Sequence, residues 1–135
     1  MSQRIHRLSF DELSPDLQAA LEPRVRRLGY LGEFFCCAGN QPAVLYAFNA
    51  MTEALKKALP DRLTEVVALT VAVLTGNDYE RHQHERLSEK LGFGREWIIA
   101  VLDGPTTESR GLASPEAAVQ QLAVGLVRSD GQAAQ

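Results

Sequence analysis

One stretch constrains the fold of this chain more than any other: the apolar run from Leu63 to Leu74, which contains hardly any polar residue. Valine, alanine and leucine fill positions 66–69 and 71–74. The β-branched content would also suit a buried strand, but a run of this length without a helix breaker is more typical of a helix. A helix that is apolar on every side has to lie among other elements, so we predict a central buried helix here.

Glu65 is the only formal charge in this run after Arg62. It lies near the start of the predicted helix, where the helix dipole stabilises an anion, and this effect alone could account for a carboxylate there. The alternative is that Glu65 pairs with a polar side chain from the helix that follows.

A second helix is predicted directly after a short turn. Gly76 interrupts the apolar run, Asn77 or Asp78 is suited to cap the new helix, and Gly92 is suited to end it after Leu91. Two helices joined by so short a turn have to be antiparallel neighbours. The sequence therefore predicts a central helix hairpin.

Polar groups head the apolar face of this second helix. Glu80 and His84 are four residues apart and share one face, which Leu87 and Leu91 continue. Such a face points into a core or an interface, where an unpartnered polar group is costly. We therefore expect Glu80 and His84 to pair with each other or with Glu65.

Prolines mark the helix starts in the N-terminal part of the chain. Ser14-Pro15 begins a helix that Pro23 is expected to break or restart, and Gly29 ends its second piece. Residues 30–41 form a connector that can include a short helix. Pro42 then begins an amphipathic helix, whose residues at the spacing of one face are Val44, Leu45, Phe48, Met51, Thr52 and Leu55.

Two more helices are predicted after the hairpin. One runs from Arg95 to Leu102 and ends at residues 103–105, followed by an exposed polar loop from Thr106 to Ala113. The last begins at Ser114-Pro115 and runs to about Arg128, with a buried face made of Val119, Leu122, Ala123 and Leu126. We therefore predict an all-α fold, a small helical bundle around the hairpin, as a single domain over residues 1–135 with its core at about residues 30–128.

Charge and composition exclude several partners. The net charge of −3 gives no overall attraction to nucleic acid or to an anionic membrane, and Arg24, Arg26 and Arg27 are expected to form a solvated helix end. No apolar run is long enough to cross a membrane, and the first residues lack the apolar run of a signal peptide. A cytoplasmic location is therefore expected.

The two cysteines, Cys36 and Cys37, are adjacent in the sequence. Adjacent cysteines form neither a disulfide framework nor a C-x-x-C redox motif, so buried free thiols are expected, with a redox-sensing pair as the alternative. The aromatic residues Phe34, Phe35 and Trp97 are expected to fill the core rather than to line a pocket.

Metal binding has weak support. His82 and His84 are two residues apart, so they point about 200° apart around a helix and cannot share one ion. Glu65, Glu80 and His84 would be a suitable ligand set for zinc or iron, but the sequence offers no further histidine at a standard spacing. We therefore expect His82 on the surface and neither a metal nor a cofactor.

Acid–base chemistry suits Glu65, Glu80 and His84 better. Two carboxylates beside one imidazole in a poorly solvated place should perturb each other's titration, and a protonated group beside an ionised one can transfer a proton. The same residues could equally form a buried network that only fixes helix packing. An anionic substrate would also need a cation, for which Arg62, Arg81 and Arg86 are available.

Four motifs of the sequence resemble those of a known family. The motifs are Gly39-Asn-Gln-Pro42, Leu63-Thr-Glu65, Thr75-Gly-x-x-Tyr79-Glu80-x-x-x-His84 and Gly92, and they are similar to those of the carboxymuconolactone decarboxylase and alkylhydroperoxidase D family. The resemblance covers roughly Tyr30 to Val127. It implies an all-α fold, assembly as trimers or hexamers, and a site in a pocket near a subunit interface.

The peroxidase members of that family carry a C-x-x-C motif just before the histidine. By register, Asn77 and Glu80 occupy the two cysteine positions here, while Glu65 and His84 match the proton-relay residues. Without a thiolate there is no nucleophile for a peroxide at this place. The pattern is instead similar to the decarboxylase-like branch.

We therefore expect a cofactor-free acid–base enzyme, a possible lyase, that acts on a small organic acid or lactone with Glu65, Glu80 and His84 as catalytic residues. The resemblance also implies a homo-oligomer. One alternative is a non-catalytic oligomeric binding protein with a structural Glu–His network. The other is a thiol peroxidase that uses Cys36 and Cys37, which requires the fold to bring them beside His84.

Overall fold

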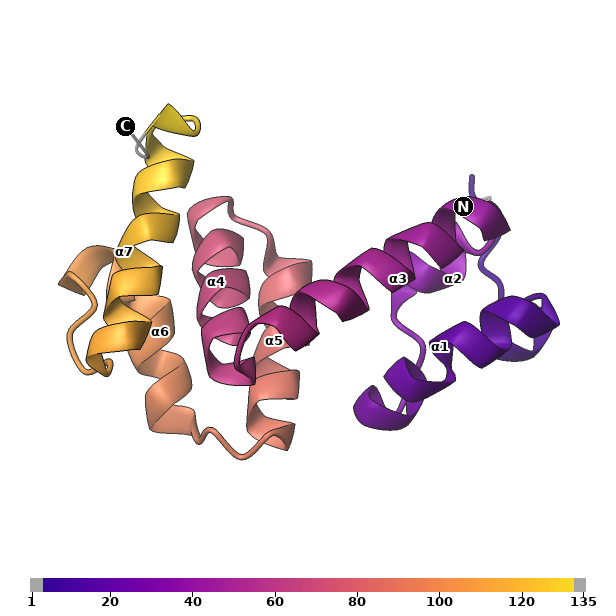
Figure 1. Cartoon of the computed structure of the whole chain (residues 1–135), viewed down its shortest axis with the longest axis horizontal. Helices are drawn as coiled ribbons and strands as arrows, with labels where there is room; N and C mark the ends of the chain where they lie inside the picture. The colour runs from indigo at the N-terminus through magenta and orange to yellow at the C-terminus, as the bar shows by residue number, and fades with distance from the viewer. Residues whose placement is uncertain (1–3, 133–135) are drawn as a thin grey trace. The chain divides into compact units, whose positions relative to one another are not determined.

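The computed structural model describes residues 4–132 of the chain. Within this range it contains seven α-helices, one short 3₁₀ helix and no strand, which confirms the predicted all-α fold (Figure 1). The helices gather in two compact units, one up to Ala58 and one from Leu59 on. A single domain over residues 1–135 stays a prediction.

The first unit contains the 3₁₀ helix and three α-helices. Its core consists of Leu13, Leu17, Leu21 and Leu45. The elements are η1 (Phe10–Glu12), α1 (Pro15–Leu28), α2 (Glu33–Ala38) and α3 (Pro42–Ala58). Ser14 caps α1 by accepting a hydrogen bond from the backbone N–H of Leu17, and Gly29 ends it with a φ of 87°, as predicted.

Pro23 does not break α1, contrary to the prediction. Proline removes the hydrogen bond to the carbonyl four residues earlier, which here belongs to Ala19. Both Pro23 and Ala19 are exposed, so water can hydrate that carbonyl. On the opposite side, the buried residues Leu21 and Arg24 hold the helix to its neighbours. Tertiary contacts therefore outweigh the local effect of the proline.

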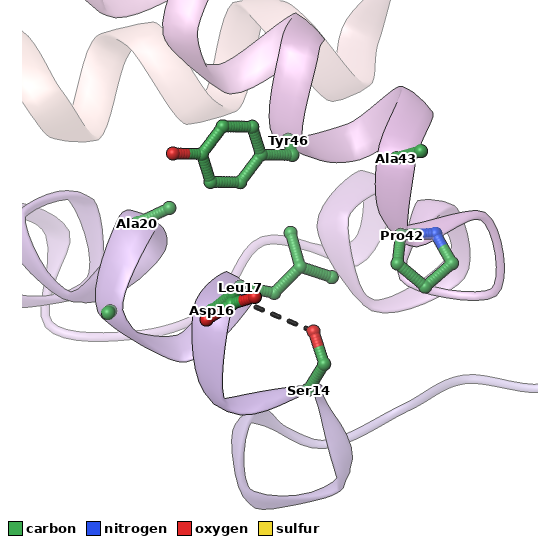
Figure 2. Close-up of a pocket in the computed structure, with 8 residues that line it drawn as sticks. Ser14, Asp16, Leu17, Ala20, Pro42, Ala43 and Tyr46 are labelled. Atoms are coloured by element: carbon green, nitrogen blue, oxygen red, sulfur yellow. Dashed lines mark hydrogen bonds between the residues drawn. The ribbon is translucent and has the colours of Figure 1, made fainter.

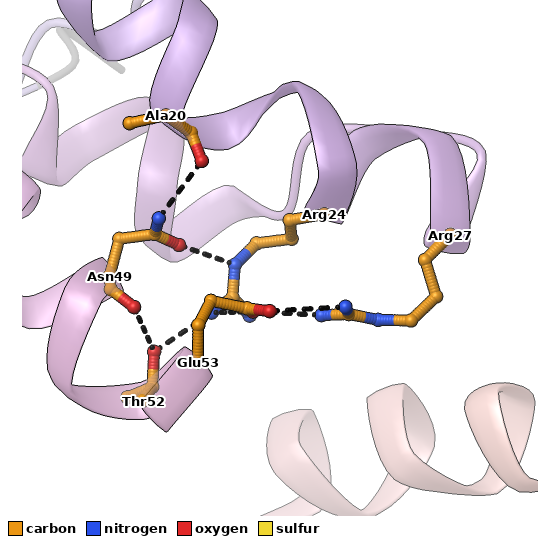
Figure 3. A network of polar contacts seen from close by, with 6 residues as sticks. All are labelled: Ala20, Arg24, Arg27, Asn49, Thr52 and Glu53. Carbon is orange, nitrogen blue, oxygen red and sulfur yellow. Dashed lines mark hydrogen bonds and ion pairs between the residues drawn. The ribbon is translucent and has the colours of Figure 1, made fainter. Parts of the chain in front are cut away.

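Arg24 is buried and forms part of a polar network, so the prediction of a solvated arginine cluster was wrong for this residue (Figure 3). Its Nε donates to Asn49 Oδ1 at 3.0 Å, and its Nη2 lies 2.9 Å from Glu53 Oε1. Arg27 binds the same carboxylate through both terminal nitrogens, and this hydrogen bonding lowers the pKa of Glu53. Arg26 is exposed and pairs with Glu22 one helical turn earlier.

This network also changes which face of α3 is buried. Leu45 and Asn49 are buried and Phe48 is half-buried, whereas Val44, Met51 and Leu55, which were expected on the buried face, are exposed. The polar side chain of Asn49 faces α1 because it donates to the carbonyl of Ala20 and accepts from Arg24. Within the first unit, α3 therefore leaves an apolar stripe uncovered.

The second unit is a bundle centred on α4. Its helices are α4 (Asp61–Leu74), α5 (Asp78–Lys90), α6 (Arg95–Thr107) and α7 (Ser114–Arg128). The first of these packs against each of the other three, which confirms the predicted central helix (Figure 1). The buried core of the unit consists of Val66, Leu69, Trp97, Ile98 and Val101. Trp97 therefore belongs to the core, as expected, whereas Phe34 of the first unit is 46% exposed, so the same prediction was wrong for Phe34.

The predicted hairpin is present as α4 and α5. Asn77 caps α5 by accepting a hydrogen bond from the backbone N–H of Glu80 at 3.1 Å. Gly76 and Gly92 adopt positive φ angles of 65° and 80° at the two ends of α5, a conformation that favours glycine. These three residues fix where α5 begins and ends, and hence where its polar side chains lie.

Helix α6 is longer than predicted, because it continues through Gly104 and Pro105 to Thr107. The hydroxyls of Thr106 and Thr107 donate to the carbonyl of Asp103, which helps to satisfy it near the helix end. The exposed loop expected from Thr106 to Ala113 therefore begins only at residue 108, and Ser109 within it is buried.

The buried face of α7 also differs from the prediction. Leu122 is exposed, while the polar residues Glu116 and Gln120 are buried. Gln120 Nε2 donates to Thr70 Oγ1 at 3.0 Å and to the carbonyl of Val101 at 2.8 Å. Gly104 makes room for it, since a Cβ there would lie 1.9 Å from Gln120 Oε1.

Candidate active site

Glu65 and His84 meet between α4 and α5. His84 Nδ1 lies 2.8 Å from Glu65 Oε2, which is a short, charge-assisted hydrogen bond when the imidazole is protonated. The side chain of Glu65 is 3% exposed and that of His84 is 20% exposed. The carboxylate of Glu65 is thus stabilised by a partner on the next helix in addition to the dipole of its own helix.

Glu80 lies on the other edge of the imidazole ring. Its Oε2 is 3.4 Å from His84 Nε2, one helical turn away on α5, and its side chain is 46% exposed. The structure therefore brings all three predicted residues together as a carboxylate–imidazole–carboxylate arrangement. One carboxylate is buried and the other is open to solvent.

Ser88 completes the site and was missed from the sequence. It is fully buried on α5, and its hydroxyl donates to Glu65 Oε2 at 3.4 Å. The oxygen that binds His84 therefore has a second donor. Ser88 stands four residues after His84, so the helical spacing that linked Glu80 to His84 also points to Ser88.

The two carboxylates control the charge of His84. Burial by itself would lower the pKa of the imidazole, but the hydrogen bonds to Glu65 and Glu80 outweigh it and raise the pKa to about 9. The hydrogen bond to His84 in turn lowers the pKa of Glu80. At neutral pH the ring is therefore an imidazolium with an ionised Glu80 beside it.

This geometry does not suit a single metal ion. Glu65 and Glu80 contact opposite nitrogens of the ring, so one ion cannot bind both carboxylates and the imidazole. Within residues 4–132, no group of three or more His, Cys, Asp or Glu side chains is arranged to hold a metal. His82 is exposed on α5, as predicted.

Among the arginines considered as substrate cations, Arg81 already has carboxylate partners. Its terminal nitrogens lie 3.3 Å from Asp78 and 3.9 Å from Glu85. Arg62 lies in the first turn of α4, and its Nε donates to Glu116 at 2.7 Å. Arg86 is exposed on α5.

The cysteines lie on α2 in the first unit. Cys36 and Cys37 are free and half-buried. Burial raises the pKa of the Cys36 thiol, and the charge of Glu33 raises it further. A raised pKa leaves less of the nucleophilic thiolate at neutral pH.

A groove of about 750 Å³ lies in the first unit between α1 and α3 (Figure 2). The ring of Tyr46 stands over it, and the residues that line it are Ser14, Asp16, Leu17, Ala19, Ala20, Pro42, Ala43 and Tyr46. Ser14 is engaged as the cap of α1. These residues include no paired acid and base, so the groove is a weaker candidate for catalysis than the His84 cluster.

Comparisons with known proteins address the same region. Residues 42–120 match the model of the carboxymuconolactone decarboxylase family, and this range is more than half of the chain and contains Glu65, Glu80 and His84. No curated protein and no solved structure matches the chain. None of the helices in residues 4–132 is both long and apolar enough to cross a membrane.

Proposed function

Because this chain belongs to the carboxymuconolactone decarboxylase family, we propose that it is a cofactor-free acid–base enzyme acting on a small organic acid or lactone. The observation that carries this proposal is the position of His84 between a buried and an exposed carboxylate. Such a ring has one edge fixed by the protein and the other edge near solvent, where a substrate can reach it.

In this proposal His84 is a general acid. Its pKa of about 9 means that it holds its proton at neutral pH and can give it to a stronger base. Glu65 retains the hydrogen bond to Nδ1–H, so the proton that leaves is the one on Nε2. The neutral tautomer that remains then carries its hydrogen on Nδ1.

The Nε2 proton of His84 suits a decarboxylation, in which a carbanion has to be protonated. When a substrate carboxylate leaves as CO₂, the C–C bond breaks and its electron pair stays on the carbon, which the unsaturated substrate must delocalise. The Nε2–H of His84 protonates that carbon, and water restores the proton through Glu80, whose carboxylate is exposed. No external oxidant or reductant is needed, as the proposed cofactor-free reaction requires.

The test is turnover by variants with a confirmed substrate, found by screening unsaturated carboxylic acids and lactones for an absorbance change and CO₂ release. His84→Ala should lower kcat by about 10²–10⁴-fold, the usual contribution of a general acid. His82→Ala is the matched control, because His82 is exposed on the same helix. Unchanged turnover in His84→Ala would contradict the assignment.

A second candidate function is a non-catalytic binding protein in which these residues only hold α4 and α5 together. The burial of Glu65 and Ser88 supports it, since both side chains are buried and hydrogen-bonded inside the bundle. It predicts that His84→Ala lowers thermal stability and that no substrate of the screen is turned over. Turnover that depends on His84 would exclude it.

For either function we propose a homo-oligomer, a trimer or hexamer, with a small molecule as ligand. The support is the exposed apolar stripe of Val44, Met51 and Leu55 along α3, which the first unit itself leaves uncovered. Light scattering after size-exclusion chromatography measures the mass. Met51→Asp and Leu55→Asp should reduce it to that of the monomer if the stripe is the interface.

A further inference from the structure

Arg62 is held in one orientation by three groups. Its Nε donates to Glu116 Oε1 at 2.7 Å. Its guanidinium carbon lies 4.6 Å from the centre of the Trp97 ring and 5.2 Å from that of the Phe93 ring. Stacking on aromatic faces and a charged hydrogen bond restrict a side chain that otherwise has many rotamers.

The carboxylate that holds Arg62 is itself fixed. Glu116 is buried on α7, and its second oxygen accepts from Trp97 Nε1 at 3.0 Å and from the backbone N–H of Ala113 at 3.4 Å. These contacts, with Arg62, lower the pKa of Glu116 against the effect of burial. The guanidinium is therefore anchored to a rigid part of the bundle.

The outer edge of the guanidinium is not engaged. Among residues 4–132, Arg62 Nη1 and Nη2 form no hydrogen bond, and the side chain is 43% exposed. Arg95 differs, because its Nη1 binds Glu85 and Glu89. An oriented guanidinium whose two terminal nitrogens are not hydrogen-bonded to the described residues matches the geometry of a carboxylate.

A continuous set of contacts joins Arg62 to the His84 cluster. Phe93, on which Arg62 stacks, donates its backbone N–H to the carbonyl of Ser88 at 3.1 Å. Ser88 in turn donates to Glu65 Oε2, which binds His84. Arg62 and Glu65 are also three residues apart on α4, so their Cβ atoms lie about 5–6 Å apart.

We propose that Arg62 binds a carboxylate group of the substrate, through its Nη1 and Nη2 edge. This inference rests on the proposed function, because it assigns the substrate class of the same site: an organic acid whose carboxylate is held at the first turn of α4, three residues before Glu65.

Trp97 makes the proposal measurable without turnover. It is the only tryptophan of the chain and stacks against Arg62, so a ligand on Arg62 should change its fluorescence. The full-length protein is titrated with succinate, with its uncharged analogue succinamide, and with sodium chloride at matched ionic strength. A saturable change with succinate alone is expected. An equal change with succinamide or sodium chloride would overturn the proposal.

Variants then test the residue. Arg62→Gln should abolish the succinate response. Arg62→Lys keeps the positive charge beside Glu116 but lacks the two parallel N–H groups of the guanidinium, so it should raise the apparent Kd for succinate about tenfold. Arg110→Gln removes the same charge from an exposed position and should bind like the wild type. Circular dichroism at 222 nm checks folding. If Arg62→Gln is unfolded, the Arg62→Lys result decides.

His84→Ala separates this proposal from the enzymatic one. Its turnover tests the general acid, whereas the succinate response of the Arg62 variants tests the carboxylate site at Arg62. Wild-type binding by Arg62→Lys or by a folded Arg62→Gln would overturn the anchor, even if turnover still depends on His84. If the succinate response is retained but turnover does not depend on His84, carboxylate binding by Arg62 is supported and the general-acid role of His84 is rejected.

Discussion

The charge of His84 should make the stability of the second unit depend on pH. The pKa of this residue is about 9 in the folded protein, against 6.5 for an unperturbed histidine. A raised pKa stabilises the folded state fully below pH 6.5, and this contribution is lost as the pH rises through 9. The protein should therefore lose stability between about pH 6.5 and pH 9.5.

The size of this loss follows from the difference in pKa. One pKa unit corresponds to about 1.4 kcal/mol, so the contribution of His84 is on the order of 3 kcal/mol. The side chain is mostly buried and the carboxylate of Glu65 is almost inaccessible, so solvent screens their contact only weakly. The exposed contact to Glu80 should contribute the smaller share.

Urea unfolding at pH 6, 7, 8 and 9 measures this effect when it is followed by Trp97 fluorescence. Trp97 is in the core of the same unit as His84, so it reports the relevant transition. His84→Gln removes the titrating group while keeping a polar side chain, and the difference between the two pH profiles isolates His84 from other groups. Parallel profiles for the wild type and His84→Gln would refute the reasoning.

Three further predictions concern the packing and the thiols. Arg24→Ala should lower the free energy of unfolding by about 3 kcal/mol in urea unfolding followed by circular dichroism, because it breaks a buried ion pair. The exposed control Arg26→Ala should change it by no more than about 0.5 kcal/mol, and equal losses would contradict this account. Gly104→Ala should cost about 1–3 kcal/mol and lower Tm, since its Cβ would overlap Gln120; an unchanged Tm would argue against the contact. No hydroperoxide consumption is expected with a dithiol reductant, and activity that disappears when Cys36 and Cys37 become Ser would instead support a thiol peroxidase.

Signals between residues close in sequence predicted much of this fold. The caps and glycines around α5 depend on spacings of a few residues, so Asn77, Gly76 and Gly92 could be placed from the sequence. The meeting of Glu65 with His84 followed because a short turn forces α4 and α5 to pack together. Ser88 was within reach of the same spacing argument.

The predictions from sequence were wrong where a side chain is buried by hydrogen-bond partners that are distant from it in the sequence. Gln120 is buried because Thr70 and Val101 accept its hydrogen bonds, and neither partner can be read from the pattern of α7. Arg24 is buried because its guanidinium binds Asn49 and Thr52 of α3, and the same contacts help to keep α1 helical beyond Pro23. A hydrophobicity pattern assigns such polar residues to the surface, since it does not contain their partners.

Glu80 distinguishes the catalytic from the structural interpretation of the His84 cluster. A network that served packing alone would gain little from a carboxylate that is almost half exposed, because exposed ion pairs contribute only about 0–1 kcal/mol. A proton-transfer site needs such a group, since the proton given up by the buried ring must be replaced from water. Glu80→Gln should therefore change stability little and turnover strongly, whereas a purely structural network predicts a small change in stability and no turnover in either protein.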